Sequence, residues 1–132
     1  KPISINPFNI GVLNMHPGIL PDNRGLDNIK WAIIDNISQG VTTHLIDSEI
    51  DKGVMIEREE IKIYNDDTLI DIDLRIKHLE QKLMLTSIGV IKNKGIKDLK
   101  KLSDGKYNKH VPYELEKTLI EKFEGYKNAR SN

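Results

Sequence analysis

A short apolar stretch at residues 10–15 most constrains what this chain can fold into, because Pro17 and Gly18 stop it directly after His16. Proline has no N–H to give to a ladder and glycine frees the backbone, so the stretch is predicted to be a strand that ends here. Side chains alternate along a strand, so Asn14 and His16 share one face and their neighbours share the other. We expect one face to pack in a core and the other to present two polar groups at the carboxyl end, where open α/β sheets bind ligands.

The next elements are predicted from turn and helix signals. Residues 17–25 hold two prolines and two glycines and should form a loop ordered by turn chemistry. Asp27 is a plausible N-cap for a helix that ends near Asn36, with Gly40 beyond it. A helix after a strand is typical of a crossover connection, so the following strand, residues 41–47, is predicted to run parallel to the first.

A third strand and a long helix follow. Residues 54–63 resume a strand pattern whose charged members indicate a solvated edge. Thr68 and Asp71 have the spacing of a capping box, which predicts that the longest helix covers residues 69–91. Its apolar positions recur at three- and four-residue steps, so it is expected to cover one face of the sheet; they are Ile72, Ile76, Leu79, Leu83, Met84 and Ile88.

The two ends of the chain are less informative. Residues 2–5 alternate in the manner of a short strand or an extended lead-in. Residues 96–110 are lysine-rich and poor in large apolar side chains, which favours a solvated, irregular segment. Pro112 can begin a last helix over residues 113–126 that docks on the body of the domain through an apolar stripe: Leu115, Leu119, Ile120 and Phe123.

Composition excludes several classes of partner. The chain has 132 residues, and its 20 lysines and arginines balance 20 acidic residues, so no overall field attracts nucleic acid or an anionic membrane. No apolar run is long enough to span a bilayer. The absence of cysteine rules out disulfides and thiolate metal sites and favours a reducing compartment, the cytoplasm. Composition leaves the formation of a homodimer open.

Two motifs carry a resemblance to a known family. Asn-x-His-Pro-Gly-x-Leu-Pro-x-x-Arg-Gly begins at Asn14, and Gly-Val-Thr-x-His-x-x-Asp-x-x-x-Asp-x-Gly begins at Gly40. In this order, joined by a helix, they resemble the catalytic half of the folate-dependent formyltransferases, which include glycinamide ribonucleotide transformylase, methionyl-tRNA formyltransferase and the sugar N-formyltransferases. The resemblance covers residues 12–90.

The resemblance implies an α/β fold, part of a Rossmann-like sheet with flanking helices. Because the chain begins with Lys1, we expect that an amino-terminal half of the catalytic domain is absent. Residues 1–95 would then be the carboxyl-terminal half of that domain. Residues 96–132 would be a connection and a terminal helix that packs on it.

Formyl transfer from 10-formyltetrahydrofolate to an amine needs a donor for the developing oxyanion and a group that moves protons near neutral pH. An asparagine amide and a histidine suit these tasks, and the resemblance assigns them to Asn14 and His16. A carboxylate beside His16 would raise the pKa of the imidazole. Spacing does not choose between Asp47 and Asp51 for that carboxylate.

The resemblance assigns the carboxylate role to Asp51, and it places Asp47 with Ile46 in the folate-binding loop. His44 is expected to orient the aspartate loop through a hydrogen bond, although a plain structural histidine fits the pattern equally well.

Three alternatives stay open at this point. Two histidines and two aspartates are a divalent-metal donor set, but they lack the i, i+4 helical spacing of a recognisable ligand pair, so no metal is assigned. A non-catalytic domain on the same fold is the second alternative. The third concerns the acceptor. The Arg24-Gly25 pair and residues 28–33 resemble the sugar N-formyltransferases, so a small-molecule amine on a nucleotide-linked sugar is expected, ahead of phosphoribosylglycinamide or methionyl-tRNA.

Overall fold

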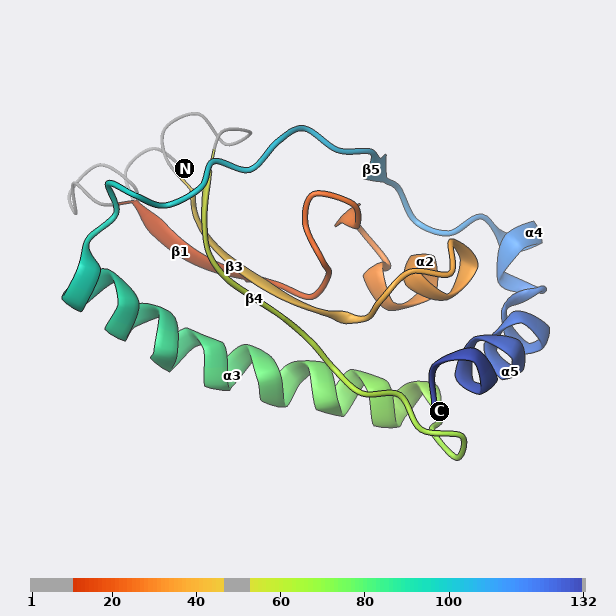
Figure 1. The fold of residues 1–132 in the computed structure, drawn as a ribbon. Coiled ribbons are helices and arrows are strands. Elements are labelled where there is room, and N and C mark those ends of the chain that lie inside the picture. The colour runs from red at the N-terminus through yellow and green to blue at the C-terminus, as the bar shows by residue number, and fades with distance from the viewer. Residues whose placement is uncertain (1–10, 47–52, 132) are drawn as a thin grey trace.

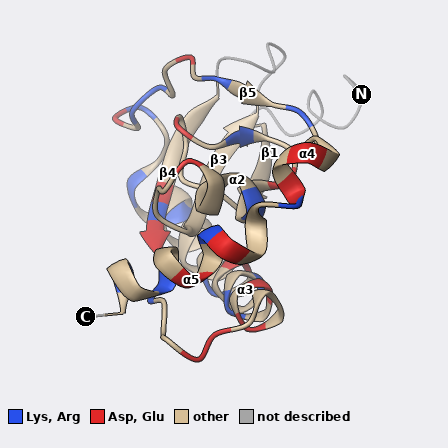
Figure 2. Cartoon of the chain, turned by 90° about the vertical axis from the view of Figure 1, so that its right-hand side faces the viewer, with Lys and Arg blue, Asp and Glu red and all other residues tan. Residues whose placement is uncertain are grey.

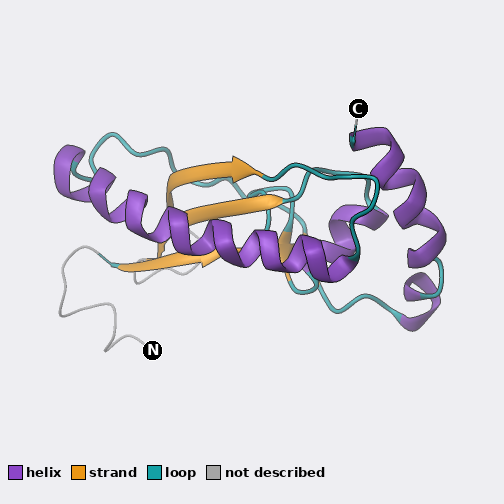
Figure 3. Cartoon of the chain, turned by 90° about the horizontal axis from the view of Figure 1, so that it is seen from below, coloured by secondary structure: helices purple, strands orange, loops and turns teal. Residues whose placement is uncertain are grey.

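The chain folds around a three-stranded sheet that has one long helix on one face. The computed structural model describes residues 11–46 and 53–131; the predicted lead-in strand at residues 2–5 lies outside this part. The strands are β1 (Val12–His16), β3 (Gly40–Ile46) and β4 (Val54–Glu60), in the order β1-β3-β4. Figure 1 shows α3 (Leu69–Lys94) along one face of this sheet, and Figure 3, seen from below, shows it in front of the strands. The architecture is mixed α/β, as predicted.

The predicted parallel pairing of the first two strands is wrong, because β1 and β3 are antiparallel with Val12 opposite Ile46. The connection contains α2 (Asn28–Ile34), which is short and lies at one end of the sheet and not across its face (Figure 1). A parallel pair needs a crossover that carries the chain back to the starting end. Here the chain re-enters the sheet at the end where it left, so β3 must run in the opposite direction.

The α3 helix confirms the capping prediction. The Thr68 hydroxyl accepts a hydrogen bond from the Asp71 N–H, and the Asp71 carboxylate accepts one from the Thr68 N–H. Four predicted apolar positions are buried, but Met84 and Ile88 are 36% and 50% exposed. The buried face of the helix ends with Ser87 in place of these two residues. The side chains that this helix contributes to the hydrophobic core are Ile72, Ile76, Leu79 and Leu83.

The β4 strand lies at the edge of the described sheet and its last three residues are exposed, as predicted. It ends at Glu60, three residues before the predicted end. Ile63 lies beyond the ladder, yet its side chain is buried in the core. The apolar pattern in the sequence therefore extends beyond the strand, because Ile63 is buried in the core although it takes no part in strand pairing.

The lysine-rich segment is more ordered than predicted. The Met55 N–H donates to the Lys100 carbonyl at 2.8 Å, and the Leu102 N–H donates to the Gly53 carbonyl at 3.0 Å, so the segment runs along β4. Farther on, β5 (Tyr107–Asn108) pairs in parallel with β2 (Arg24–Gly25). We call residues 100–108 the strap; Figure 1 shows it on the side of the sheet opposite α3.

The last predicted helix is divided into α4 (Tyr113–Glu116) and α5 (Leu119–Arg130). The division falls at Thr118, whose hydroxyl donates to the Leu115 carbonyl at 2.7 Å and whose N–H makes a tight three-residue turn to the same oxygen. The α5 helix packs against α2 through buried Leu119, Phe123 and Tyr126. The predicted stripe member Ile120 is 80% exposed, because the division turns it away from the core.

Charge is distributed without a dominant sign. Figure 2 shows basic and acidic segments interleaved along the chain, in agreement with the zero formal net charge. Within the described residues, no helix is both long enough and apolar enough to cross a membrane.

Candidate active site

The β1 strand delivers Asn14 and His16 to the face of the sheet opposite α3. Its alternate residue Met15 packs against the core cluster, as the sequence predicted. The antiparallel register places Asn14 opposite His44 and His16 opposite Thr42 on β3. Because cross-strand partners point to the same side of a sheet, these four polar side chains share one surface.

Asn14 and His44 are hydrogen-bonded across the strands. The Asn14 Nδ2 and His44 Nε2 atoms are 2.9 Å apart. Burial is the largest cause that lowers the pKa of His44 from 6.5 to about 4, and the neighbouring His16 and Arg24 side chains act in the same direction. His44 is therefore neutral at physiological pH, and its Nε2 lone pair accepts from the Asn14 amide. A primary amide has two N–H bonds, so Asn14 keeps one donor for another acceptor.

His16 is held by the loop that follows its strand. Its Nε2 atom lies 2.7 Å from the Asn23 carbonyl oxygen. Burial and the charge of Arg24 lower its pKa, while the bond to Asn23 acts in the opposite direction with less weight. In these surroundings His16 is a neutral imidazole at pH 7, suited to accept a proton. The sequence predicted a raised pKa through Asp51, a residue outside the described part.

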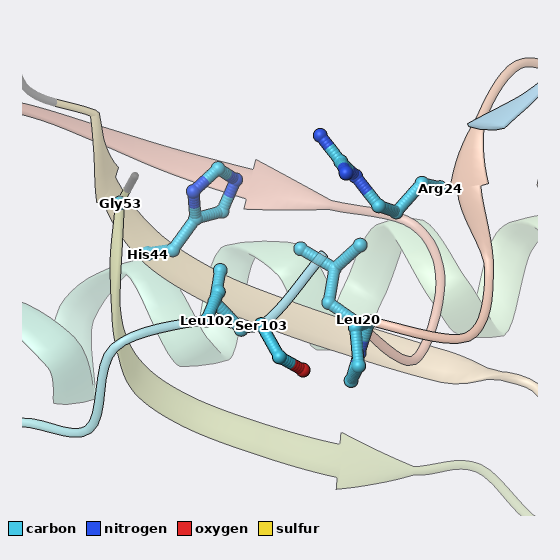
Figure 4. A pocket seen from close by; sticks show the side chains of 7 residues that line it. Leu20, Arg24, His44, Gly53, Leu102 and Ser103 are labelled. Atoms are coloured by element: carbon cyan, nitrogen blue, oxygen red, sulfur yellow. The ribbon is translucent and has the colours of Figure 1, made fainter. Parts of the chain in front are cut away.

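A small cavity opens beside His44. Its volume is about 50 Å³, and its walls come from the loop after β1, from β2, from β3 and from the strap. Figure 4 shows the His44 ring and the Arg24 guanidinium at the same space, with Leu20, Leu102 and Ser103 around it. The lining combines apolar side chains with a cation and a hydroxyl, but the volume is well below the roughly 300 to 1,000 Å³ of a pocket for a whole small molecule.

The structure describes only some of the other predicted site residues. Asp47 and Asp51 lie outside the described residues. Ile46 is the half-buried last residue of β3, opposite Val12. The predicted role of His44 at the aspartate loop stays a prediction, and the bond the structure gives it is the one to Asn14.

Of the donors in the metal alternative, the structure describes the two histidines and not Asp47 or Asp51. His16 and His44 each make a hydrogen bond within the fold, to Asn23 and to Asn14. Over residues 11–46 and 53–131, no group of three or more histidine, cysteine or acidic side chains is arranged to hold a metal ion.

Sequence reasoning gave no role to several residues that build the site. Asn23 and Asn28 contact His16, and Arg24 lines the cavity. These three lie in or beside the first motif, so their closeness to His16 in the sequence is the signal that could have predicted their place in the site. Leu102 and Ser103 come from the strap, about 80 residues downstream, and no local pattern connects them to the site.

Comparison with known proteins shows the family of this chain. The model of the formyl transferase family matches residues 3–88, and the chain belongs to this family. Methionyl-tRNA formyltransferase of Alkaliphilus oremlandii is 37% identical over 87 residues, which are 65% of this chain and 28% of that protein. The chain thus spans little more than a quarter of the length of such curated relatives.

Two solved structures extend the comparison. One is the formyltransferase PseJ from Anoxybacillus kamchatkensis, in complex with UDP-4,6-dideoxy-4-formamido-L-AltNAc and tetrahydrofolate. It is similar over 91% of this chain and 62% of its own, with a TM-score of 0.70 and 30% identity. Phosphoribosylglycinamide formyltransferase from Bacillus halodurans is similar over 62% of this chain and 43% of its own, with a TM-score of 0.54 and 34% identity.

Proposed function

We propose that the protein transfers a formyl group from 10-formyltetrahydrofolate to the amine of a nucleotide-linked amino sugar. The observation that carries the choice of acceptor is the extent of the likeness to PseJ, which covers 91% of this chain, against 62% for the phosphoribosylglycinamide enzyme. A match over 91% of the chain must include most of residues 96–132 as well as the motif region. The strap, which lies in that region, forms part of the cavity wall.

The chemistry follows from the side chains on the site surface. The acceptor nitrogen attacks the formyl carbon, the bond from that carbon to the folate nitrogen breaks, and a proton moves from the amine to the departing nitrogen. Asn14 donates its remaining N–H to the formyl oxygen as negative charge develops there. His16 takes up and returns the proton as a neutral imidazole, and Asp51 acts with it.

The cavity beside His44 fits one end of a folate and not the whole molecule. At about 50 Å³ it has room for a formyl group or the edge of a ring. Leu20 and Leu102 offer apolar contact, and Arg24 with Ser103 offers hydrogen-bond donors. Ile46 and Asp47 remain the proposed contacts to the rest of the folate.

Methionyl-tRNA is the second candidate acceptor, because curated relatives such as the Alkaliphilus oremlandii protein are methionyl-tRNA formyltransferases. Their matches cover about two thirds of this chain, and a balance of 20 basic and 20 acidic residues offers no field for a polyanion. We therefore rank the sugar acceptor first. We also keep the proposed division of the chain, in which residues 1–95 are the carboxyl-terminal half of the catalytic domain and residues 96–132 are a connection and a terminal helix that packs on it.

An acceptor panel tests the proposal. The full-length protein is incubated with 10-formyltetrahydrofolate and, separately, a UDP-linked amino sugar, phosphoribosylglycinamide or methionyl-tRNA, and the products are identified by mass spectrometry. We expect the formamide of the amino sugar. Formylation of methionyl-tRNA alone would reverse the ranking, and transfer to none of the three would favour a non-catalytic domain.

A further inference from the structure

Two buried asparagines join the loop after β1 to the first turn of α2. The Asn23 side chain is fully buried and Asn28 is 7% exposed. Asn23 Nδ2 donates to the Asn28 carbonyl at 2.9 Å, and Asn28 Nδ2 lies 3.1 Å from both the carbonyl and the side-chain oxygen of Asn23. With two oxygens as neighbours, the Asn28 atom must be the nitrogen. The pair is reciprocal and fixes the position of the Asn23 carbonyl.

That carbonyl decides which nitrogen of His16 carries the hydrogen. It lies 2.7 Å from His16 Nε2, and a carbonyl oxygen can only accept, so Nε2 must be the N–H. Asn28 Nδ2 is also 3.3 Å from the same nitrogen, but the shorter contact to an acceptor outweighs it. The opposite tautomer would set a lone pair against the carbonyl oxygen. The basic nitrogen of His16 is therefore Nδ1.

The surrounding loop is built to keep this contact. A Cβ at Gly18 would come within 2.8 Å of the Asn23 carbonyl oxygen and 3.1 Å of His16 Nε2, so only glycine fits beside the bond. The fully buried Thr42 hydroxyl donates to the Gly18 carbonyl at 2.8 Å and accepts from the Leu20 N–H at 3.0 Å. Both ends of the turn are thus fastened to β3.

We propose that Asn23 and Asn28 are positioning residues that hold His16 in the Nε2–H tautomer, so that Nδ1 is the nitrogen that exchanges the proton. The reactive role of Nδ1 rests on the proposed function, whereas the tautomer does not. Asn14 and His44 supply an internal contrast. His44 Nε2 accepts from Asn14, so His44 must carry its hydrogen on Nδ1, and the two histidines of the site have opposite tautomers.

Nitrogen-15 NMR of the histidine rings tests the tautomers without any assay of activity. Long-range proton–nitrogen spectra distinguish Nε2–H from Nδ1–H in each neutral ring, and His16→Gln and His44→Gln spectra assign the signals. We expect Nε2–H for His16 and Nδ1–H for His44 in the unmodified protein. An Nδ1–H signal for His16 would overturn the proposal, and this measurement needs no variant of the asparagine pair to fold.

Variants then test the role of the pair. Asn28→Ala removes the amide, and Asn28→Asp keeps its size while replacing the donor; Asn128→Ala, an exposed asparagine on α5, is the matched control. We expect a mixture of His16 tautomers and a loss of kcat of about 10- to 100-fold, with the KM for folate little changed, in the two Asn28 variants only.

Retention of a single Nε2–H tautomer and of full kcat in both Asn28 variants would overturn the positioning role. Should no acceptor be formylated, the proposed function fails alone, since the tautomers of the wild type and of the variants are still read from the spectra.

Discussion

The half-buried, neutral state of His44 makes the stability of the fold depend on pH. The pKa of His44 is lowered from 6.5 to about 4, chiefly by burial. A histidine whose pKa is lowered by folding makes its full contribution to the stability of the native state when the pH is above its pKa in the unfolded chain. That contribution is lost as the pH falls from 6.5 through about 4, because the unfolded chain then binds a proton that the native state resists.

The size of the effect follows from the same values. Without any reduction for screening by water, the lowering of the pKa corresponds to about 3 kcal/mol in the free energy of unfolding. Since the ring is only half-buried and water screens part of the interaction, we expect about 2 kcal/mol between pH 7 and pH 4. His44→Gln removes the titrating group while keeping an acceptor for Asn14, so its free energy of unfolding should fall by about 2 kcal/mol less than that of the wild type over this interval.

Urea unfolding followed by circular dichroism at a series of pH values provides the measurement. Carboxylates that titrate in the same interval contribute equally to both proteins, so the comparison isolates His44. The matched control is His78→Gln, at an exposed position on α3, which should retain the wild-type dependence. A His44→Gln protein with the same pH dependence as the wild type would refute the assignment of a neutral, half-buried His44.

Three further substitutions test the site, the core and the strap, and a fourth serves as a control. Asn14→Ala should lower kcat by about 100- to 1000-fold in formyl-transfer assays, because it removes the proposed donor to the oxyanion; a loss below threefold would remove Asn14 from that role. Ser87→Ala leaves the buried Thr43 hydroxyl, now 2.6 Å from Ser87 Oγ, with one partner fewer, and should cost about 1 to 3 kcal/mol in urea unfolding. Gly25 has φ +93°, and a Cβ there would collide with the backbone of β5, so Gly25→Ala should destabilise the fold by about 1 to 3 kcal/mol or more. A Cβ at Gly89 on α3 meets no atom, so the control Gly89→Ala should stabilise the fold by about 0.5 to 1 kcal/mol. Equal melting temperatures for the two variants would contradict the packing of the strap.

Features set by neighbours in sequence could be predicted from the sequence. The presentation of Asn14 and His16 on one face follows from the two-residue period of a strand, and Pro17 marks its end. The capping box at Thr68 and Asp71 depends on a spacing of three residues. In each case the interacting groups lie within one turn of a helix or one step of a strand.

Features set by distant contacts could not be predicted. The direction of β3 depends on where α2 packs, and a strand–helix–strand pattern alone does not contain that information. The pairing of Arg24 with Tyr107 joins segments more than 80 residues apart, and a lysine-rich composition gave no sign of it. The division of the last helix at Thr118 reflects a side-chain hydrogen bond that competes with the helical pattern.

The role of His16 in the proposed reaction is the central claim. The most direct test compares single-turnover formyl transfer to the UDP-linked amino sugar by the full-length protein and by its His16→Ala variant. Calorimetry on both proteins measures folate binding separately. We expect the variant to lose about 100- to 10,000-fold in rate while its affinity for a stable 10-formyl analogue changes little. Near-normal turnover with intact folate binding would contradict the account.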